Sequence, residues 1–233
     1  MKFKIAHLYY DLMNLYGEQG NILALKKAFK DQKITTEVDL LSVGDKIDFK
    51  AYDIFYMGTG SGQNLLIVLE DIKKYDEDIK TAIKNNQYFI ITGNAHELFG
   101  KYIQINDHKY NALGIFDYYA IENPQRIVGQ SLMSFKNLKP IIGFQNRACC
   151  LVNNDNHLFS VTSGFAGYAG GKYEGYHENN FYGTYQLGPL LIRNPHFTSY
   201  IVKAILKKKY KKPKPTFEDK AYDEYIKNFY EKS

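Results

Sequence analysis

The segment from Tyr88 to Gly100 has the pattern of a buried strand, a tight turn and the start of a helix. In many α/β enzymes, such a strand–turn–helix places an exposed nucleophile on a strained elbow. Gly93 holds the elbow position in this chain, and neither Thr92 nor Asn94 can replace an activated thiol. The sequence therefore predicts the architecture of a nucleophilic enzyme without its nucleophile.

Few other side chains in the sequence are candidates for catalysis or metal binding. Cys149 and Cys150 are adjacent in a β-rich segment, and an ordinary thiol is mostly protonated near neutral pH, so we interpret them as semi-buried strand residues. His96 follows the elbow and either lines a crevice or lies on a helix surface. No His, Cys and Asp cluster has zinc spacing, and Gly58–Gly62 lacks the Lys-Ser/Thr of a phosphate-binding loop. We therefore predict no metal and no nucleotide cofactor.

The elements around the elbow alternate between strands and helices. We expect strands at Lys4–Tyr10, Thr36–Val43, Asp53–Met57 and Tyr88–Thr92, and helices at Ile22–Lys33 (with Asn21 as N-cap), Asn64–Lys84 and Ala95–Lys101. This order predicts an α/β, flavodoxin-like, mostly parallel sheet with helices on both faces. Ligands bind at the carboxyl ends of such strands, where Gly58–Gly62 and Gly93–Ala95 lie. Both turns are therefore expected to face one crevice.

The second half of the chain predicts an antiparallel β extension. Its expected elements are strands at Phe116–Glu122, Arg126–Phe135, Ile141–Val152 and Leu158–Ser163, a strand and turn at Gly175–Pro189, a helix from Pro195 to about Lys209, and a terminal helix at Phe217–Tyr230. We expect residues 1–210 to form one domain, followed by a basic linker and C-terminal helix at 211–233.

Composition narrows the class of protein. The 233 residues are 45% hydrophobic, which is enough for a sizeable core, and no apolar run approaches the roughly 18 residues of a membrane span. The first residues show no signal peptide, and adjacent cysteines rarely form a bridge, so we expect a reducing, cytoplasmic setting.

The net charge of +5 does not indicate nucleic-acid binding. Only three of the 30 basic residues are arginine, the residue that makes bidentate contacts to bases and phosphates. One local basic run stands out, Lys207–Lys214. We interpret it as a solvated helix end and linker, with contact to an anionic surface as the alternative.

Three segments together resemble one family. They are Leu8–Leu25, the elbow with Leu98–Tyr102, and Gly183–Leu191. Their ordered set resembles the CobB/CobQ-type class I glutamine amidotransferases, and within these the GatD subunits of lipid II isoglutaminyl synthases. The resemblance implies glutamine hydrolysis and transfer of ammonia to an ATP-dependent, Mur-ligase-like partner, which amidates the D-glutamate of the peptidoglycan stem peptide.

The family's catalytic residues are absent from the matching positions. The family elbow reads Cys-Gly-Gly-Tyr-Gln, whereas this chain has Gly93-Asn-Ala-His-Glu97. The family's Gly-Thr-Tyr-Leu-His-Gly-Pro becomes Gly183–Pro189, with Leu187 at the histidine position. The resemblance thus implies no catalytic residue. It assigns ligand binding to Gly58, Thr59, Gly60, Asn94 and Arg126.

Three hypotheses follow from these substitutions. The first is a catalytically degenerate subunit that scaffolds or regulates a Mur-ligase-like partner. The second is a stand-alone module that binds glutamine, another amino acid or a peptide in a vacated crevice, which glycine and leucine should make larger and more apolar. The third and weakest is a hydrolase of altered chemistry that uses Cys149 or Cys150.

Overall fold

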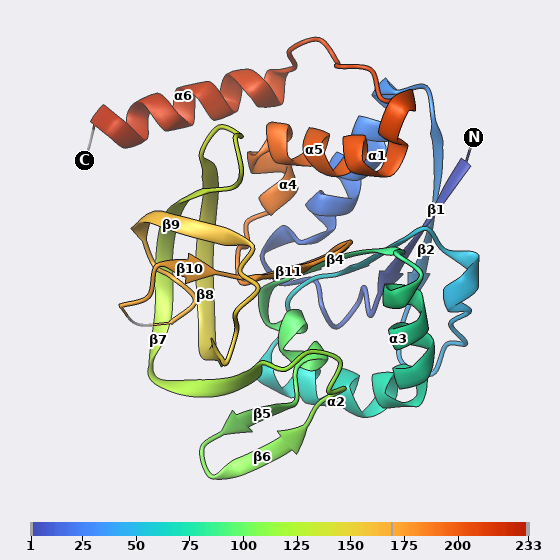
Figure 1. The fold of residues 1–233 in the computed structure, drawn as a ribbon, viewed down its shortest axis with the longest axis vertical. Coiled ribbons are helices and arrows are strands. Elements are labelled where there is room, and N and C mark those ends of the chain that lie inside the picture. Colours follow the sequence, from blue (N-terminus) through green and yellow to red (C-terminus); the bar gives the residue numbers. More distant parts are fainter. Residues whose placement is uncertain (1, 169, 232–233) are drawn as a thin grey trace.

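The computed structural model describes residues 2–168 and 170–231, which form two β-sheets flanked by helices (Figure 1). The first sheet has the strand order β11-β12-β4-β3-β1-β2. Its strands are β1 (Lys2–Leu8), β2 (Thr35–Leu41), β3 (Ile54–Met57), β4 (Tyr88–Thr92), β11 (Tyr176–Glu178) and β12 (Phe181–Thr184). The strands from β12 to β2 are parallel, and β11 is an antiparallel edge strand. All four residues of β3 are apolar and buried, as expected for a strand covered on both faces.

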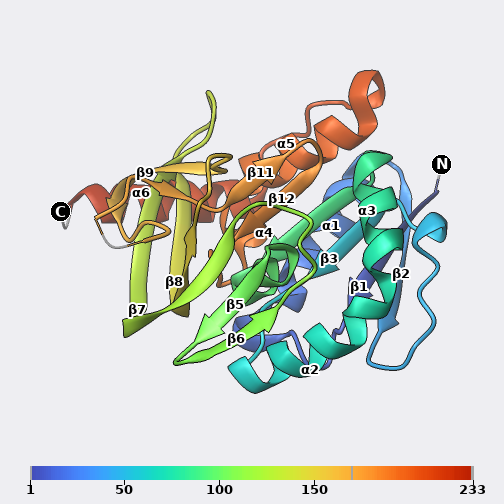
Figure 2. The same ribbon diagram turned by 60° about the horizontal axis from the view of Figure 1, so that its bottom comes forward.

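Helices cover both faces of this sheet (Figure 2). One face is covered by α1 (Gln19–Asp31), α4 (Leu190–Arg193) and α5 (Pro195–Leu206), and the other by α2 (Gly62–Ile72) and α3 (Asp76–Lys84). Each helix turns an apolar stripe inward; α1, for example, buries Leu25 and Phe29. The predicted α/β class with a mostly parallel sheet is confirmed.

The second sheet forms the β extension. It has the order β10-β9-β7-β5-β6, with β8 also paired to β7. Its strands are β5 (Tyr102–Ile105), β6 (His108–Asn111), β7 (Tyr119–Ser134), β8 (Ile141–Val152), β9 (Phe159–Gly164) and β10 (Tyr173–Glu174). All its pairings are antiparallel except that of β5 with β7. The two strands predicted at Phe116–Glu122 and Arg126–Phe135 are one long strand, β7, with a register shift between Glu122 and Ile127.

The C-terminal helix α6 (Phe217–Glu231) packs on the β extension and lies at its end in Figure 1. Tyr222 is its anchor, buried with Leu132 and Ile142, and the Tyr222 hydroxyl donates to the Pro140 carbonyl at 2.7 Å. Within residues 2–168 and 170–231, no helix has the length and apolarity needed to cross a bilayer.

Several predicted helix boundaries are wrong. α1 begins at Gln19, so Asn21 is a buried helix residue rather than an N-cap. The single helix expected at Asn64–Lys84 is divided into α2 and α3 by a 3₁₀ turn at Lys73–Tyr75, where the Tyr75 hydroxyl donates to the Asp45 carbonyl at 2.6 Å. The helix expected at Ala95–Lys101 is a 3₁₀ segment at Gly93–Phe99.

Candidate functional site: a closed elbow

The elbow lies where three parallel strands end side by side. β4 ends at Thr92, and Gly93 has a φ of +64°, a left-handed conformation that glycine adopts without strain. Because β3 and β12 flank β4, the loop at 58–60 and Leu187 reach the same edge of the sheet. The structure therefore brings together the two glycine-rich turns and the positions that the resemblance assigns to nucleophile and histidine.

Side chains fill the space in front of Gly93. A Cβ atom built there would lie 2.1 Å from Thr59 Cβ and 2.9 Å from Leu187 Cδ2. Carbon atoms in contact are normally about 3.5–4.0 Å apart, so a side chain at this position must displace Thr59. Thr59 and Leu187 are only 4% and 1% exposed. The prediction of a larger crevice is therefore wrong in front of Gly93, because the Thr59 and Leu187 side chains occupy that space.

Thr59, Gly60 and Asn94 form what we call the elbow latch. Asn94 Oδ1 accepts hydrogen bonds from the Thr59 hydroxyl at 2.8 Å and from the Gly60 N–H at 3.0 Å. Asn94 Nδ2 donates to the Gly60 carbonyl at 3.0 Å, and the Asn94 N–H donates to Thr59 Oγ1 at 3.3 Å. Stabilising an oxyanion requires N–H groups aimed at the ligand. The latch already engages the Gly60 and Asn94 N–H groups.

A buried carboxyl group lies beneath the elbow. Glu18 Oε2 accepts hydrogen bonds from the Tyr56 hydroxyl at 2.7 Å and from the Thr92 hydroxyl. Asn21 Nδ2 donates to the Tyr56 hydroxyl oxygen at 2.8 Å, which ties α1 to β3. Burial raises the pKa of Glu18 to about 7, although the hydrogen bonds from Thr92 and Tyr56 oppose the shift. Glu18 was not predicted as a site residue, because its position just before α1 is typical of a solvated helix start.

His96 lies inside the protein, neither on a helix surface nor in an open crevice. Its Nδ1–H donates to the Gly93 carbonyl at 2.6 Å, and its ring packs edge-on against Tyr185 with centroids 4.2 Å apart. Burial lowers the pKa of His96 to about 3, so the ring is neutral. His96 therefore supports the elbow backbone from behind.

Arg147 is a buried cation behind His96, and it was not predicted as a site residue. Its Nε donates to Gln145 Oε1 at 2.7 Å, its Nη2 donates to the Ala166 carbonyl at 2.6 Å, and its guanidinium lies 4.3 Å from the Tyr185 ring centroid. Burial raises the pKa of nearby Glu97 to about 7, although Tyr185 and the charge of Arg147 oppose the shift. The side chains of this cluster are buried.

The two cysteines are buried on β8. Burial raises the pKa of the Cys149 thiol, and the Glu97 carboxyl beside it raises that pKa further. Since the thiolate is the reactive form, Cys149 is a poor nucleophile. Among the described residues, no group of three or more His, Cys, Asp and Glu could hold a metal ion.

Arg126 is exposed at the bulge of β7, outside the latch. Its Nε donates to Asn146 Oδ1 at 2.5 Å, and Asn146 Nδ2 donates to the Tyr16 hydroxyl at 2.7 Å. The neighbour of Tyr16, Leu15, donates its N–H to the Thr59 carbonyl at 3.0 Å. A chain of polar contacts thus runs from Arg126 to the loop that carries the latch, although Arg126 itself is not part of the closed elbow.

Similarity to known proteins identifies the family of the chain. Residues 4–195 match the CobB/CobQ-like glutamine amidotransferase domain. The chain is 29% identical over 206 residues to the lipid II isoglutaminyl synthase (glutamine-hydrolyzing) subunit GatD of Staphylococcus aureus, covering 88% of this chain and 85% of that protein. It is 30% identical over 214 residues to the subunit of the same name from Streptococcus pneumoniae, covering 90% and 82%.

A solved structure shares the fold. A glutamine amidotransferase from Thermotoga maritima superimposes with a TM-score of 0.55 over 97% of this chain and 92% of its own, at 11% sequence identity. The family match spans all the strands of the β extension and all but the first two residues of the strands in the parallel sheet. The chain therefore belongs to the CobB/CobQ-like glutamine amidotransferase family.

Proposed function

We propose that this chain is a catalytically silent glutamine amidotransferase subunit. The filled space in front of Gly93 is the observation that carries the proposal. The family chemistry needs a thiolate at the elbow and a histidine that activates it, and removal of one member of such a couple already removes most of the catalysis. Here both positions lack the required group, and Thr59 fills the place of the nucleophile.

The role that remains is one of assembly. The two bacterial relatives are named as subunits of a synthase that acts on lipid II. By this similarity, we propose that the chain scaffolds or regulates a Mur-ligase-like partner in amidation of the peptidoglycan stem peptide. Intact packing around the elbow, with Glu18, Tyr56 and Thr92 joined by hydrogen bonds, supports a preserved scaffold.

Three of the five residues expected from the sequence to bind a ligand form the latch, whereas Gly58 and Arg126 lie outside it. The polar groups of Thr59, Gly60 and Asn94 are paired with one another, so a ligand must open the latch before it can reach them. We propose that Arg126, which is exposed, is the group best placed to contact a carboxylate at the rim. No observation favours the stand-alone binding module or the hydrolase that uses Cys149 over the silent subunit.

Release of glutamate from glutamine tests the absence of catalysis. The purified chain should release no more glutamate than a buffer control, both alone and mixed with the Mur-ligase-like protein of the same organism. A Cys149→Ser/Cys150→Ser variant serves as the matched comparison. Glutamate release by the unsubstituted chain that this double variant abolishes would restore the cysteine hydrolase and end the proposal of silence.

Association with the partner tests the scaffold. The two proteins, expressed together, should elute as one complex in size-exclusion chromatography with light-scattering detection. The Mur-ligase-like protein should then amidate stem peptide faster from free ammonia with this chain than without it. Separate elution and an unchanged rate would exclude the scaffolding role, whatever the result of the glutamine assay.

A further inference from the structure

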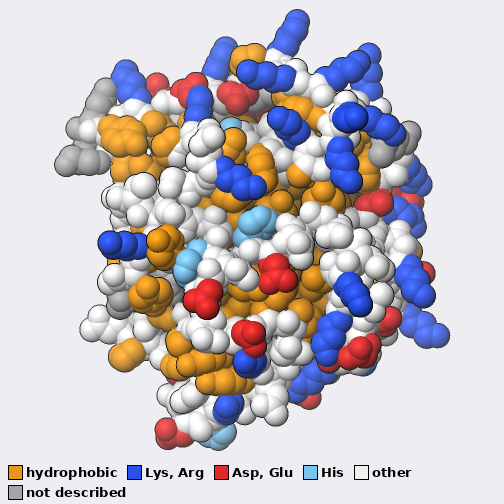
Figure 3. All heavy atoms as spheres, viewed as in Figure 1, with side chains coloured by type: hydrophobic (Ala, Val, Ile, Leu, Met, Phe, Trp, Pro, Cys, Tyr) orange, Lys and Arg blue, Asp and Glu red, His pale blue; other side chains and the backbone are white. Residues whose placement is uncertain are grey.

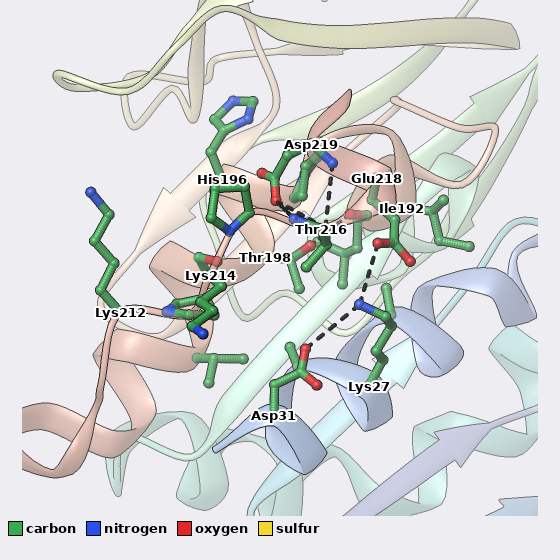
Figure 4. A pocket seen from close by; sticks show the side chains of 18 of the residues that line it. Lys27, Asp31, Ile192, His196, Thr198, Lys212, Lys214, Thr216, Glu218 and Asp219 are labelled. Atoms are coloured by element: carbon green, nitrogen blue, oxygen red, sulfur yellow. Dashed lines mark hydrogen bonds and ion pairs between the residues drawn. The ribbon is translucent and has the colours of Figure 1, made fainter. Parts of the chain in front are cut away.

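A concave site lies beside the C-terminal segment of the chain, and none of the three latch residues lines it. It is a partly open cavity of about 520 Å³, lined mainly by α1, α4, α5, the segment 210–216 and the start of α6. Pockets for small organic ligands typically have volumes of about 300–1,000 Å³. We call this site the C-terminal cavity; Figure 4 shows its lining from close by.

The walls of the C-terminal cavity are mainly apolar. The side chains that make them come from α1, α5 and the connecting segment: Leu23, Ala24, Ala28, Val202, Pro213 and Pro215. Small alanines on α1 keep the space open, and the two prolines stiffen the segment that closes it. Such a surface is suited to a flexible hydrocarbon group.

The connecting segment is fixed in place over the cavity. Gln32, the residue directly after α1, makes two hydrogen bonds with the backbone of Lys211, one at 2.7 Å to its carbonyl and one at 2.8 Å from its N–H. Lys27 lies 3.3 Å from Glu218, and Lys139 lies 2.7 Å from Asp223, which holds α6 to the same walls. The cavity is therefore formed before any ligand arrives, which limits the entropy lost on binding.

The charged groups of the lining are distributed unevenly. Each acidic group already has a partner: Asp31 and Glu218 flank Lys27, Asp223 pairs with Lys139, and Asp219 accepts the Thr216 N–H at 2.6 Å. Lys212 and Lys214 lie on the side opposite Lys27 in Figure 4, and they have no ion pair within the described part of the chain. They are exposed and belong to the basic run Lys207–Lys214, whose end of the molecule carries many lysines in Figure 3.

We propose that the C-terminal cavity binds a small amphiphile that carries one anionic head group, with its hydrocarbon part between α1 and α5 and its head group at Lys212 and Lys214. An apolar cavity with free cations on one side matches both parts of such a molecule. The proposal gives a binding function to the basic run, and it does not depend on the closed elbow or on a Mur-ligase-like partner.

Octyl phosphate is the probe for this site. Titration calorimetry on the full-length chain should show saturable binding of octyl phosphate and much weaker binding of 1-octanol. Lys212→Ala/Lys214→Ala should weaken octyl phosphate binding by about tenfold or more, since a hydrogen bond to a charged group contributes on that order. Lys208→Ala/Lys211→Ala removes the same charge from the same run outside the lining, and it should change binding by less than about twofold.

Variants that fill the cavity distinguish binding inside the cavity from attraction to a basic surface. Ala28→Phe should occupy the space and abolish binding, and Ala24→Phe from the preceding turn provides a second filling variant if the first is less stable by thermal denaturation. The proposal is overturned if octyl phosphate does not bind, if both folded filling variants bind it normally, or if the two double-lysine variants weaken binding equally.

The same chemistry occurs in soluble acyl or prenyl phosphates and in anionic membrane lipids. Sedimentation with phosphatidylglycerol vesicles, compared with phosphatidylcholine vesicles, distinguishes these sources. Vesicle binding that Ala28→Phe abolishes identifies a lipid ligand, and octyl phosphate binding without vesicle binding identifies a soluble one. Vesicle binding that persists in both folded filling variants shows surface attraction alone and contradicts the proposed site.

Discussion

At the scale of single residues, Thr59 determines what position 93 can hold. Its side chain lies where a Cβ of residue 93 would be, and its hydroxyl is fixed by Asn94. This contact joins residues far apart in the chain, so no local pattern reveals it. The sequence correctly places glycine at the elbow, but the occupancy of the space in front of it depends on tertiary packing.

Gly93→Ala should therefore destabilise the protein by about 2–4 kcal/mol, because it combines a positive φ with overpacking against Thr59. Thr59→Gly should lower the free energy of unfolding less in the Gly93→Ala variant than in the unsubstituted protein, because it removes the atoms that clash with the new Cβ. Urea denaturation of the four proteins in a double-mutant cycle measures this coupling. Strictly additive losses would show that Thr59 does not restrict position 93.

Glu18 should make stability depend on pH. Its pKa is about 7 in the folded protein against an ordinary value of 4.5, so the folded state binds the proton more tightly. The stabilisation is complete below pH 4.5 and is lost as the pH rises to about 7, by an amount on the order of 3 kcal/mol. His7 opposes this trend, because burial lowers its pKa to about 4 and protonation below pH 6.5 destabilises the fold.

Comparison with a variant isolates the Glu18 contribution. Glu18→Gln should reduce the loss of unfolding free energy between pH 5 and 8 without removing it, because burial also raises the pKa of Glu97 to about 7. Glu77→Gln, on the exposed face of α3, is the control variant. Urea titrations across this pH range, followed by circular dichroism, give both profiles. Parallel profiles for Glu18→Gln and the unsubstituted protein would mean that Glu18 is ionised throughout.

At the scale of elements, patterns within one segment predicted more than contacts between segments. Tyr88–Thr92 was placed correctly because it is a short apolar run before glycine. The β5–β6 hairpin was missed, although Asn106 and Asp107 form the kind of turn that links two strands, with Asn106 at a φ of +50°. The break at Lys73–Tyr75 was not predicted, because apolar residues keep a helical spacing on both sides of it; the Tyr75 hydroxyl there contacts the Asp45 carbonyl, which is distant in the sequence.

The docking of α6 should depend on Tyr222. Tyr222→Ala removes a side chain that is only 4% exposed, so it should lower the free energy of unfolding by about 3 kcal/mol. Tyr230 is 59% exposed, and Tyr230→Ala should lower the free energy of unfolding by less than about 0.5 kcal/mol. Hydrogen exchange should accelerate in α6 of Tyr222→Ala and remain slow in β1, β3 and β4. Equal acceleration in the central sheet would show that α6 is required for the whole fold.

At the scale of the whole molecule, α6 contacts both the β extension and helix α1, which covers the parallel sheet. Tyr222 contacts the β extension through Pro140, and Glu218 contacts α1 through Lys27. The fold class and the family were predictable because they depend on element order and motif order along the entire chain. The C-terminal cavity was not predictable, because its walls come from helices near opposite ends of the sequence.

The full-length chain should accordingly unfold in a single transition. With 21 tyrosines and no tryptophan, near-ultraviolet circular dichroism reports tyrosine packing, and the far-ultraviolet signal reports helix content. The urea unfolding curves from near- and far-ultraviolet circular dichroism should coincide, because α6 contacts both the β extension and α1. Loss of helix signal at a lower urea concentration than loss of tyrosine signal would indicate that α6 detaches first.

The elbow latch also constrains how this chain can evolve. Gly93→Cys alone meets Thr59, Thr59→Gly alone opens the latch without supplying a thiol, and Leu187→His alone places an imidazole in an apolar site that is 1% exposed. Each single step lowers stability before any activity appears, so selection for glutamine hydrolysis has no intermediate to favour. If the chain is catalytically silent, as proposed, a latch of this kind means that glutamine hydrolysis at the elbow would require several changes at once.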